Sequence, residues 1–253
     1  MIKNVATLMR EASLCWGIEV LGQPNVVNAF ISFYNHYRLD CVSVGSGVAI
    51  FESYCIEASS NIVFHLVDPD YLSFIRMRIP KSTELKEIIS IIDTFALKPH
   101  YPLVKDFVLA KNHLVSNSTM LLNWCNPGVD YYDYDAIVMV KPVSIFAVYG
   151  QDHDDNLVVG PAGSYKFQLF CKYITRGRKS CKSLRRPFVI SVREDDEIES
   201  FASQYKIVYS CLSETVFKTT PMVIKMSWLE RIDRPLIFIE PDIAHLPTTL
   251  VHV

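Results

Sequence analysis

The stretch that decides the fold is residues 39–74. Its first part, residues 39–52, reads LDCVSVGSGVAIFE, and residues 62–70 read IVFHLVDPD. A short apolar run ends at the turn Gly45-Ser46-Gly47, an amphipathic segment follows, and a second apolar run ends on Asp68. Short apolar runs bounded by turn residues are typical of buried strands. The stretch therefore predicts a strand, a glycine turn, a helix, and a second strand that ends in a carboxylate.

A glycine turn that opens a helix is suited to binding a nucleotide. Glycine lets the backbone come close to a ligand, and the following helix offers unpaired N–H groups. A carboxylate about 20 residues further on can bind two ribose hydroxyls. We expect Val44, Gly45, Ser46 and Gly47 to border such a ligand and Asp68 to bind its ribose. The alternative for the two glycines is a tight turn without a ligand. Asp68 could also cap a helix, a role that is compatible with binding a ribose.

Outward from this stretch, the first 150 residues alternate between helix and strand. Apolar periodicity predicts helices at residues 5–16, 25–38, 82–97 and 134–140. Strands are expected at residues 41–44, 62–68, 106–110, 118–124 and 144–149. Such alternation predicts a mostly parallel sheet with helices on both faces and ligands at the carboxyl ends of the strands. Gly45, Asp68 and Asn123 would then lie on one edge of the sheet.

The second half of the chain is expected to complete the same sheet. Residues 206–212 and 222–228 predict two strands that pair as an antiparallel hairpin, and helices are expected at residues 164–174 and 195–205. We interpret residues 1–253 as one α/β domain. Residues 1–38 would form a helical cover at its N-terminus, and residues 151–194 would form an insertion.

Composition excludes several classes of protein. Half of the 253 residues are hydrophobic and 12% are aromatic, so the chain can bury a large core. The net charge of −2 gives no overall attraction to nucleic acid or to an anionic membrane. No apolar run reaches the roughly 18 residues needed to span a bilayer. The seven cysteines include no Cys-x-x-Cys pair and the histidines show no ligand spacing, so we expect no metal site and a cytoplasmic location.

One charged segment is a candidate for binding a partner. Lysine and arginine are concentrated between Lys172 and Arg186, and an acidic run follows at residues 194–199. A basic run can bind RNA phosphates or an acidic partner. The alternative is a solvated loop whose charge the acidic run offsets.

Taken together, these features resemble the class I (Rossmann-like) S-adenosylmethionine-dependent methyltransferases over residues 25–230. The resemblance implies a seven-stranded, mostly parallel sheet that ends in an antiparallel hairpin. Its first motif is an acid, one residue, and then Gly-x-Gly-x-Gly. Gly45 and Gly47 match this motif, Ala49 stands at the third glycine, and Ser43 stands where the acid is common. That acid supports binding of the methionine part of the cofactor in the superfamily.

The resemblance also assigns roles to three further residues. Asp68 matches the acid that holds the ribose of S-adenosylmethionine. Asn112, after the strand expected at residues 106–110, would meet the adenine. Asn123 falls where the superfamily often has Asp or Asn beside the transferred methyl group. The resemblance therefore implies a transferase that uses S-adenosylmethionine as cofactor, with an acceptor that it does not specify.

Two other interpretations remain. A nicotinamide dinucleotide requires Gly-x-Gly-x-x-Gly or Ala, and Ile50 stands at the third position, where a bulky side chain opposes close packing of helix on strand. The second is a degenerate methyltransferase fold that acts as a binding or assembly module, which Ser43 and Ala49 permit. A bulky side chain that fills the space beyond Gly45 and Gly47 would favour this second interpretation.

Overall fold

The computed structural model describes residues 24–47, 49–69, 97, 99–123, 132–151, 163–176, 191–217 and 220–233. The helices predicted at residues 5–16 and 82–97 lie outside these ranges, apart from Leu97. In chain order the elements are α3 (Pro24–Tyr37), β1 (Cys41–Val44), α4 (Ile50–Ala58), β2 (Phe64–Val67), α7 (Val104–Ala110), β3 (Thr119–Asn123), α8 (Tyr132–Val140), β4 (Ser144–Gln151), α9 (Tyr165–Arg176), α11 (Val192–Ala202), β5 (Tyr205–Phe217) and β6 (Thr220–Arg231).

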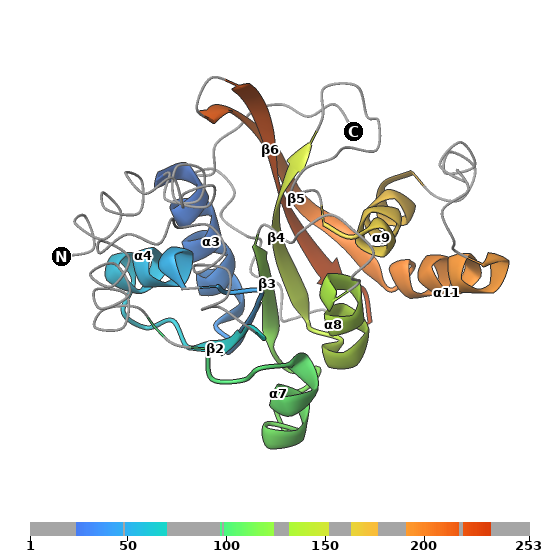
Figure 1. Cartoon of the computed structure of the whole chain (residues 1–253), viewed down its shortest axis with the longest axis horizontal. Coiled ribbons are helices and arrows are strands. Elements are labelled where there is room, and N and C mark those ends of the chain that lie inside the picture. Colours follow the sequence, from blue (N-terminus) through green and yellow to red (C-terminus); the bar gives the residue numbers. More distant parts are fainter. Residues whose placement is uncertain are drawn as a thin grey trace, which may run out of the picture.

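The strands form one mixed sheet in the order β2-β1-β3-β4-β6-β5 (Figure 1). β1 pairs in parallel with β2 and β3, and β3 pairs in parallel with β4. β6 runs antiparallel to both β4 and β5. The predicted α/β fold with a terminal antiparallel hairpin is confirmed. The prediction of seven strands is wrong, because the described part of the chain contains six.

The missing strand is the one predicted at residues 106–110. These residues belong instead to helix α7, which the side chain of Asp106 helps to start by accepting a hydrogen bond from the Leu103 N–H (3.1 Å). Pro102, just before, has no N–H to offer to a strand neighbour. Among the described residues that follow β2, Tyr101 forms a parallel bridge to Val67.

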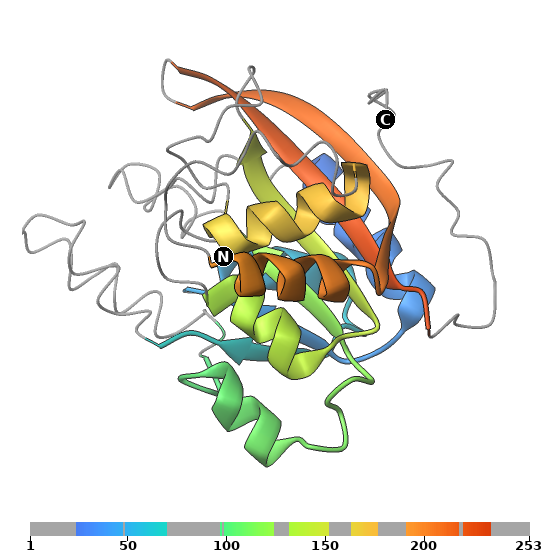
Figure 2. The ribbon, with the colours of Figure 1, turned by 90° about the vertical axis from the view of Figure 1, so that its right-hand side faces the viewer.

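Helices cover both faces of the sheet. On one face, α3 and α4 pack through Phe30, Phe33 and Phe51 against the strands. On the other face, the core includes Ile137 of α8 and Phe170 of α9, together with residues of α7 and α11. Figure 2 shows α8, α9 and α11 in front of the sheet and α3 behind it. The sheet therefore lies between two layers of helices.

Strand β4 shows why an almost wholly apolar sequence forms a central strand. Ile145 and Ala147 pack into the core on the side of α8, whereas Phe146 and Val148 pack into the core on the side of α3. Successive side chains of a strand point to opposite faces, so a strand buried on both faces needs apolar residues throughout. All four of these side chains are buried. Among the helices of the described ranges, none combines the length and the apolar character needed to cross a membrane.

Candidate functional site

The glycine turn after β1 has the backbone that the sequence pattern requires. Gly45 (φ 72°) and Gly47 (φ 55°) adopt the left-handed conformation. Ala49 adopts it as well (φ 54°), immediately before α4. A residue other than glycine gives up roughly 1–2 kcal/mol in this conformation. The turn thus keeps a glycine-like backbone at its third position although the glycine is absent.

The turn is fixed to the end of β2 by hydrogen bonds. The N–H groups of Gly45 and Ser46 both donate to the Val67 carbonyl, at 2.9 and 3.3 Å. The next residue, Asp68, accepts a hydrogen bond from the Gly47 N–H through Oδ2 (2.9 Å). The carboxylate predicted from the sequence is therefore beside the turn predicted from the sequence.

These residues lie at the point where the order of the strands in the sheet reverses. From β1 the chain moves to β2 on one side, and later returns to β3 on the other side of β1. Ligands of open α/β sheets bind at such a point, outside the carboxyl ends of the strands. Val44 pairs with Leu122, so the backbone of Asn123, the last residue of β3, lies on the same edge. The side chain of Asn123 is outside the described part of the chain.

Asn112 is not brought to this site. It lies exposed in the turn between α7 and β3. Nearby, the Ser116 N–H donates to the carbonyl of Val140, at the end of α8 and just before β4 begins. This turn is therefore at the amino ends of β3 and β4, opposite the glycine turn. The strand expected at residues 106–110 is helix α7, so Asn112 lies on the opposite edge of the sheet from the glycine turn.

The space around the two glycines differs. A Cβ added to Gly47 would meet no atom within 4 Å. A Cβ added to Gly45 would lie 3.3 Å from the hydroxyl oxygen of Tyr132, at the start of α8, and 3.4 Å from its ring. The buried hydroxyl of Ser46, between them, has no hydrogen-bond partner among the described residues. Open space therefore lies at Gly47, whereas the phenol of Tyr132 borders Gly45. Nothing in the sequence pattern pointed to Tyr132.

A second carboxylate lies beneath the turn. Glu52, in the first turn of α4, is 1% exposed and accepts a hydrogen bond from the hydroxyl of Ser43 on β1. Burial raises the pKa of Glu52 to about 7, and the negative charge of Asp68 adds to the rise, while the Ser43 hydrogen bond opposes it. Ser43 occupies the position at which the methyltransferases that the sequence resembles often have an acid. Here the carboxylate beside that position is Glu52, which belongs to α4. An acidic residue early in a helix that follows a glycine turn is the sequence signal for it.

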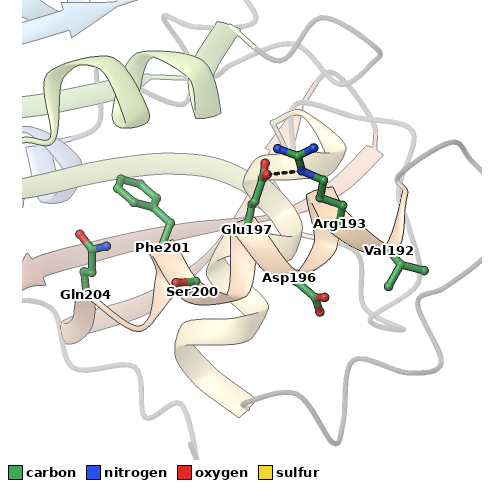
Figure 3. Close-up of a pocket in the computed structure, with 7 residues that line it drawn as sticks. All are labelled: Val192, Arg193, Asp196, Glu197, Ser200, Phe201 and Gln204. Atoms are coloured by element: carbon green, nitrogen blue, oxygen red, sulfur yellow. Dashed lines mark hydrogen bonds and ion pairs between the residues drawn. The ribbon is translucent and has the colours of Figure 1, made fainter.

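Other candidate features lie elsewhere or are absent from the described ranges. No group of three potential metal ligands occurs among the described residues. An open hollow lies along α11, lined by Arg193, Phe201 and five neighbours, with Arg193 and Glu197 paired across its helix face at 3.0 Å (Figure 3). It includes none of the predicted site residues.

The basic run between Lys172 and Arg186 is described only in part. Residues 172–176 end helix α9, and residues 177–186 lie outside the described part of the chain.

Comparisons with known proteins give matches of structure only. No family model matches the chain, and no curated protein matches it. Among solved structures it is similar to the plantazolicin methyltransferase BpumL in complex with SAH, with a TM-score of 0.42 and 13% identity over 91% of this chain and 97% of that one. It is also similar to magnesium protoporphyrin IX methyltransferase from Synechocystis PCC 6803 with bound SAH (TM-score 0.37, 10% identity, 81% of each chain). A third is M. jannaschii TYW2 in complex with AdoMet (TM-score 0.36, 10% identity, 81% of this chain and 77% of that one). At these TM-scores and identities the likeness assigns neither a family nor an activity to this chain.

Proposed function

We propose that the chain binds S-adenosylmethionine at the glycine turn and acts as a methyltransferase. The observation that carries the proposal is the 2.9 Å hydrogen bond from the Gly47 N–H to the Asp68 carboxylate, at the carboxyl ends of β1 and β2. This hydrogen bond holds the Asp68 carboxylate beside the glycine turn and the start of α4, at the point where the strand order reverses. The unpartnered Ser46 hydroxyl and the open space at Gly47 support a ligand there.

Each residue of the site has a defined part in this proposal. The backbone of Val44, Gly45, Ser46 and Gly47 would border the cofactor, and Asp68 would bind its ribose hydroxyls. Asn123, at the end of β3, would lie nearest the transferred group. The segment at Tyr101, whose carbonyl accepts a hydrogen bond from the Asp68 N–H at 3.1 Å, would lie next to the ribose, where the resemblance had suggested Asn112.

Such a site would act mainly by alignment. Bound S-adenosylmethionine supplies a methyl group on a sulfonium, which is already a strong electrophile. The chain's residues hold the donor and keep the acceptor in line with it, which can supply most of the rate enhancement. A base is needed only where the acceptor has a proton to lose. The absence of an obvious catalytic pair among the described residues is compatible with this chemistry.

A second function, a degenerate methyltransferase fold that serves as a binding or assembly module, is favoured by Tyr132. Its phenol lies 3.3 Å from the position of a Gly45 Cβ and takes up space beside this glycine. Ser43 in place of the common acid points the same way. The two functions predict opposite results in a binding experiment.

Calorimetric titration with S-adenosylmethionine and S-adenosylhomocysteine separates them. The enzyme proposal expects saturable binding, and Asp68→Ala should weaken it by at least tenfold because two charge-assisted hydrogen bonds to the ribose are lost. Glu57→Gln, an exposed site on α4, is the control and should bind as the wild type does. No binding at millimolar ligand would contradict the enzyme proposal and favour the module. Binding that Asp68→Ala leaves unchanged would show that the ribose is held elsewhere.

The proposal also covers the acceptor and the cellular setting. The basic run between Lys172 and Arg186 would guide RNA or an acidic partner to the molecule. A cytoplasmic location is part of the proposal, because the seven cysteines of the sequence include no Cys-x-x-Cys pair and suit a reducing compartment.

A further inference from the structure

Glu52 is a buried carboxylate whose side-chain hydrogen-bond partner among the described residues, Ser43, is neutral. It is 1% exposed, and its recorded side-chain hydrogen bond comes from the hydroxyl of Ser43. No lysine, arginine or histidine of the described ranges forms an ion pair with it. A buried carboxylate without a cation is costly to keep ionised, so it either binds a proton or faces a positive charge.

Among the described residues, the titratable groups around Glu52 add negative charge rather than positive. Asp68 faces it from the end of β2 and raises its pKa. Cys41 of β1 and Cys55 of α4 are the titratable groups nearest on the core side, and burial raises the pKa of both thiols, so they stay neutral. The two carboxyl groups, Asp68 beside the turn and Glu52 beneath it, make this end of the sheet less favourable for an anion than for a cation.

We infer that Glu52 is a specificity-determining residue of the glycine-turn site, which selects a positively charged nucleoside and releases a proton when one binds. This inference rests on the proposed function and deepens it, because it names the charge that the site recognises. Near neutral pH, some molecules of the free protein have Glu52 protonated and others have it ionised. A cation placed above the turn stabilises the carboxylate, and the displaced proton passes to the solvent. The negative charges of Glu52 and Asp68 would repel the pyrophosphate of a dinucleotide.

The test compares two nucleosides that differ in charge. S-adenosylmethionine carries a sulfonium and an ammonium, whereas 5′-methylthioadenosine has the same nucleoside and no positive charge. Titrations at pH 7 in two buffers of different ionisation enthalpy count the protons released. Wild type should release a fraction of a proton on binding S-adenosylmethionine and none on binding 5′-methylthioadenosine, and its affinity for the former should rise from pH 6 to pH 8.

The variant Glu52→Gln keeps the shape of the side chain and removes its charge. It should lose the proton release and the pH dependence, and its preference for S-adenosylmethionine over 5′-methylthioadenosine should fall about tenfold, as expected for the loss of one nearby charge. Glu57→Gln on the exposed face of α4 should behave as wild type. A purely structural role of Glu52 would weaken both ligands equally and would leave the preference unchanged.

A second variant keeps the test decisive where Glu52→Gln folds poorly. Ser43→Ala removes the hydrogen bond that favours the ionised form, so the pH midpoint of S-adenosylmethionine affinity should move upward. Unchanged proton release and preference in Glu52→Gln, or an unchanged midpoint in Ser43→Ala, would overturn the inference while the proposed function stands. Failure of wild type to bind either nucleoside would instead overturn the proposed function, and the inference with it.

Discussion

At the scale of single residues, Tyr132 decides how open the site is. Its ring borders Gly45, so a ligand that approaches this glycine has to displace the phenol. Tyr132→Ala should therefore raise the affinity for S-adenosylmethionine several-fold and speed its association, measured by calorimetry and stopped-flow fluorescence. Tyr132→Phe is the matched control, because it keeps the ring at Gly45 and loses only the hydroxyl.

The opposite result would give Tyr132 a different role. If Tyr132→Ala weakens binding while Tyr132→Phe does not, the ring is a contact for the ligand and not an obstacle to it.

Glu52 also makes the stability of the free protein depend on pH. Burial raises its pKa from 4.5 to about 7, so between these values the native state binds more protons than the unfolded chain. The free energy of unfolding should then fall as the pH rises through this window, by roughly 3 kcal/mol if the whole shift is expressed. Below pH 4.5 this loss is absent, and above pH 7 it is complete.

Urea unfolding of wild type and Glu52→Gln at pH 5 and pH 8 isolates this contribution from that of other carboxylates. The variant should gain stability relative to wild type as the pH rises, because glutamine has no proton to lose. A constant difference between the two proteins across the window would contradict a raised pKa at Glu52.

At the scale of elements, Asp133 joins α8 to α9. Its buried carboxylate accepts hydrogen bonds from the Ser164 N–H (2.7 Å), the Ser164 hydroxyl (2.5 Å) and the Tyr134 N–H (2.6 Å). Ser164 in turn accepts a hydrogen bond from the Phe167 N–H through its hydroxyl (3.2 Å), so it caps α9. One carboxylate thus fixes the start of α8, which carries Tyr132, to the start of the next helix.

Asp133→Ala should lower the free energy of unfolding by about 3 kcal/mol, because buried donors lose their acceptor. Chemical denaturation measures this loss. Asp135→Ala, on the exposed side of the same helix, is the control and should cost less than about 1 kcal/mol. Equal losses in both variants would show that the contact with α9 contributes nothing.

The helices and strands that could be predicted are those with unambiguous periodicity or composition. The apolar run of β4 and the pairing of the two C-terminal strands as a hairpin were predicted correctly, although both hairpin strands are longer than predicted. The segment at residues 106–110 was not, since a short apolar run fits a strand and a helix equally well. The deciding signal was Asp106, whose side chain caps the helix at Leu103.

At the scale of the whole molecule, the sheet order brings the site together. Gly45, Gly47 and Asp68 could be predicted because one strand-turn-helix-strand unit holds all three. Tyr132 could not, because it reaches Gly45 only through the packing of α8 beside β1, which no local pattern encodes. The same holds for the hydrogen bond between Ser43 and Glu52, which depends on how α4 lies on β1.

The central claim is that the ligand site is the glycine turn at the reversal point of the sheet. Hydrogen-exchange mass spectrometry with and without saturating S-adenosylmethionine tests this location directly. We predict slower exchange in peptides that cover residues 41–58 and 64–69, where the turn, the start of α4 and Asp68 lie, and unchanged exchange in α11. Unchanged exchange in these peptides, or protection confined to the hollow of α11, would contradict the account.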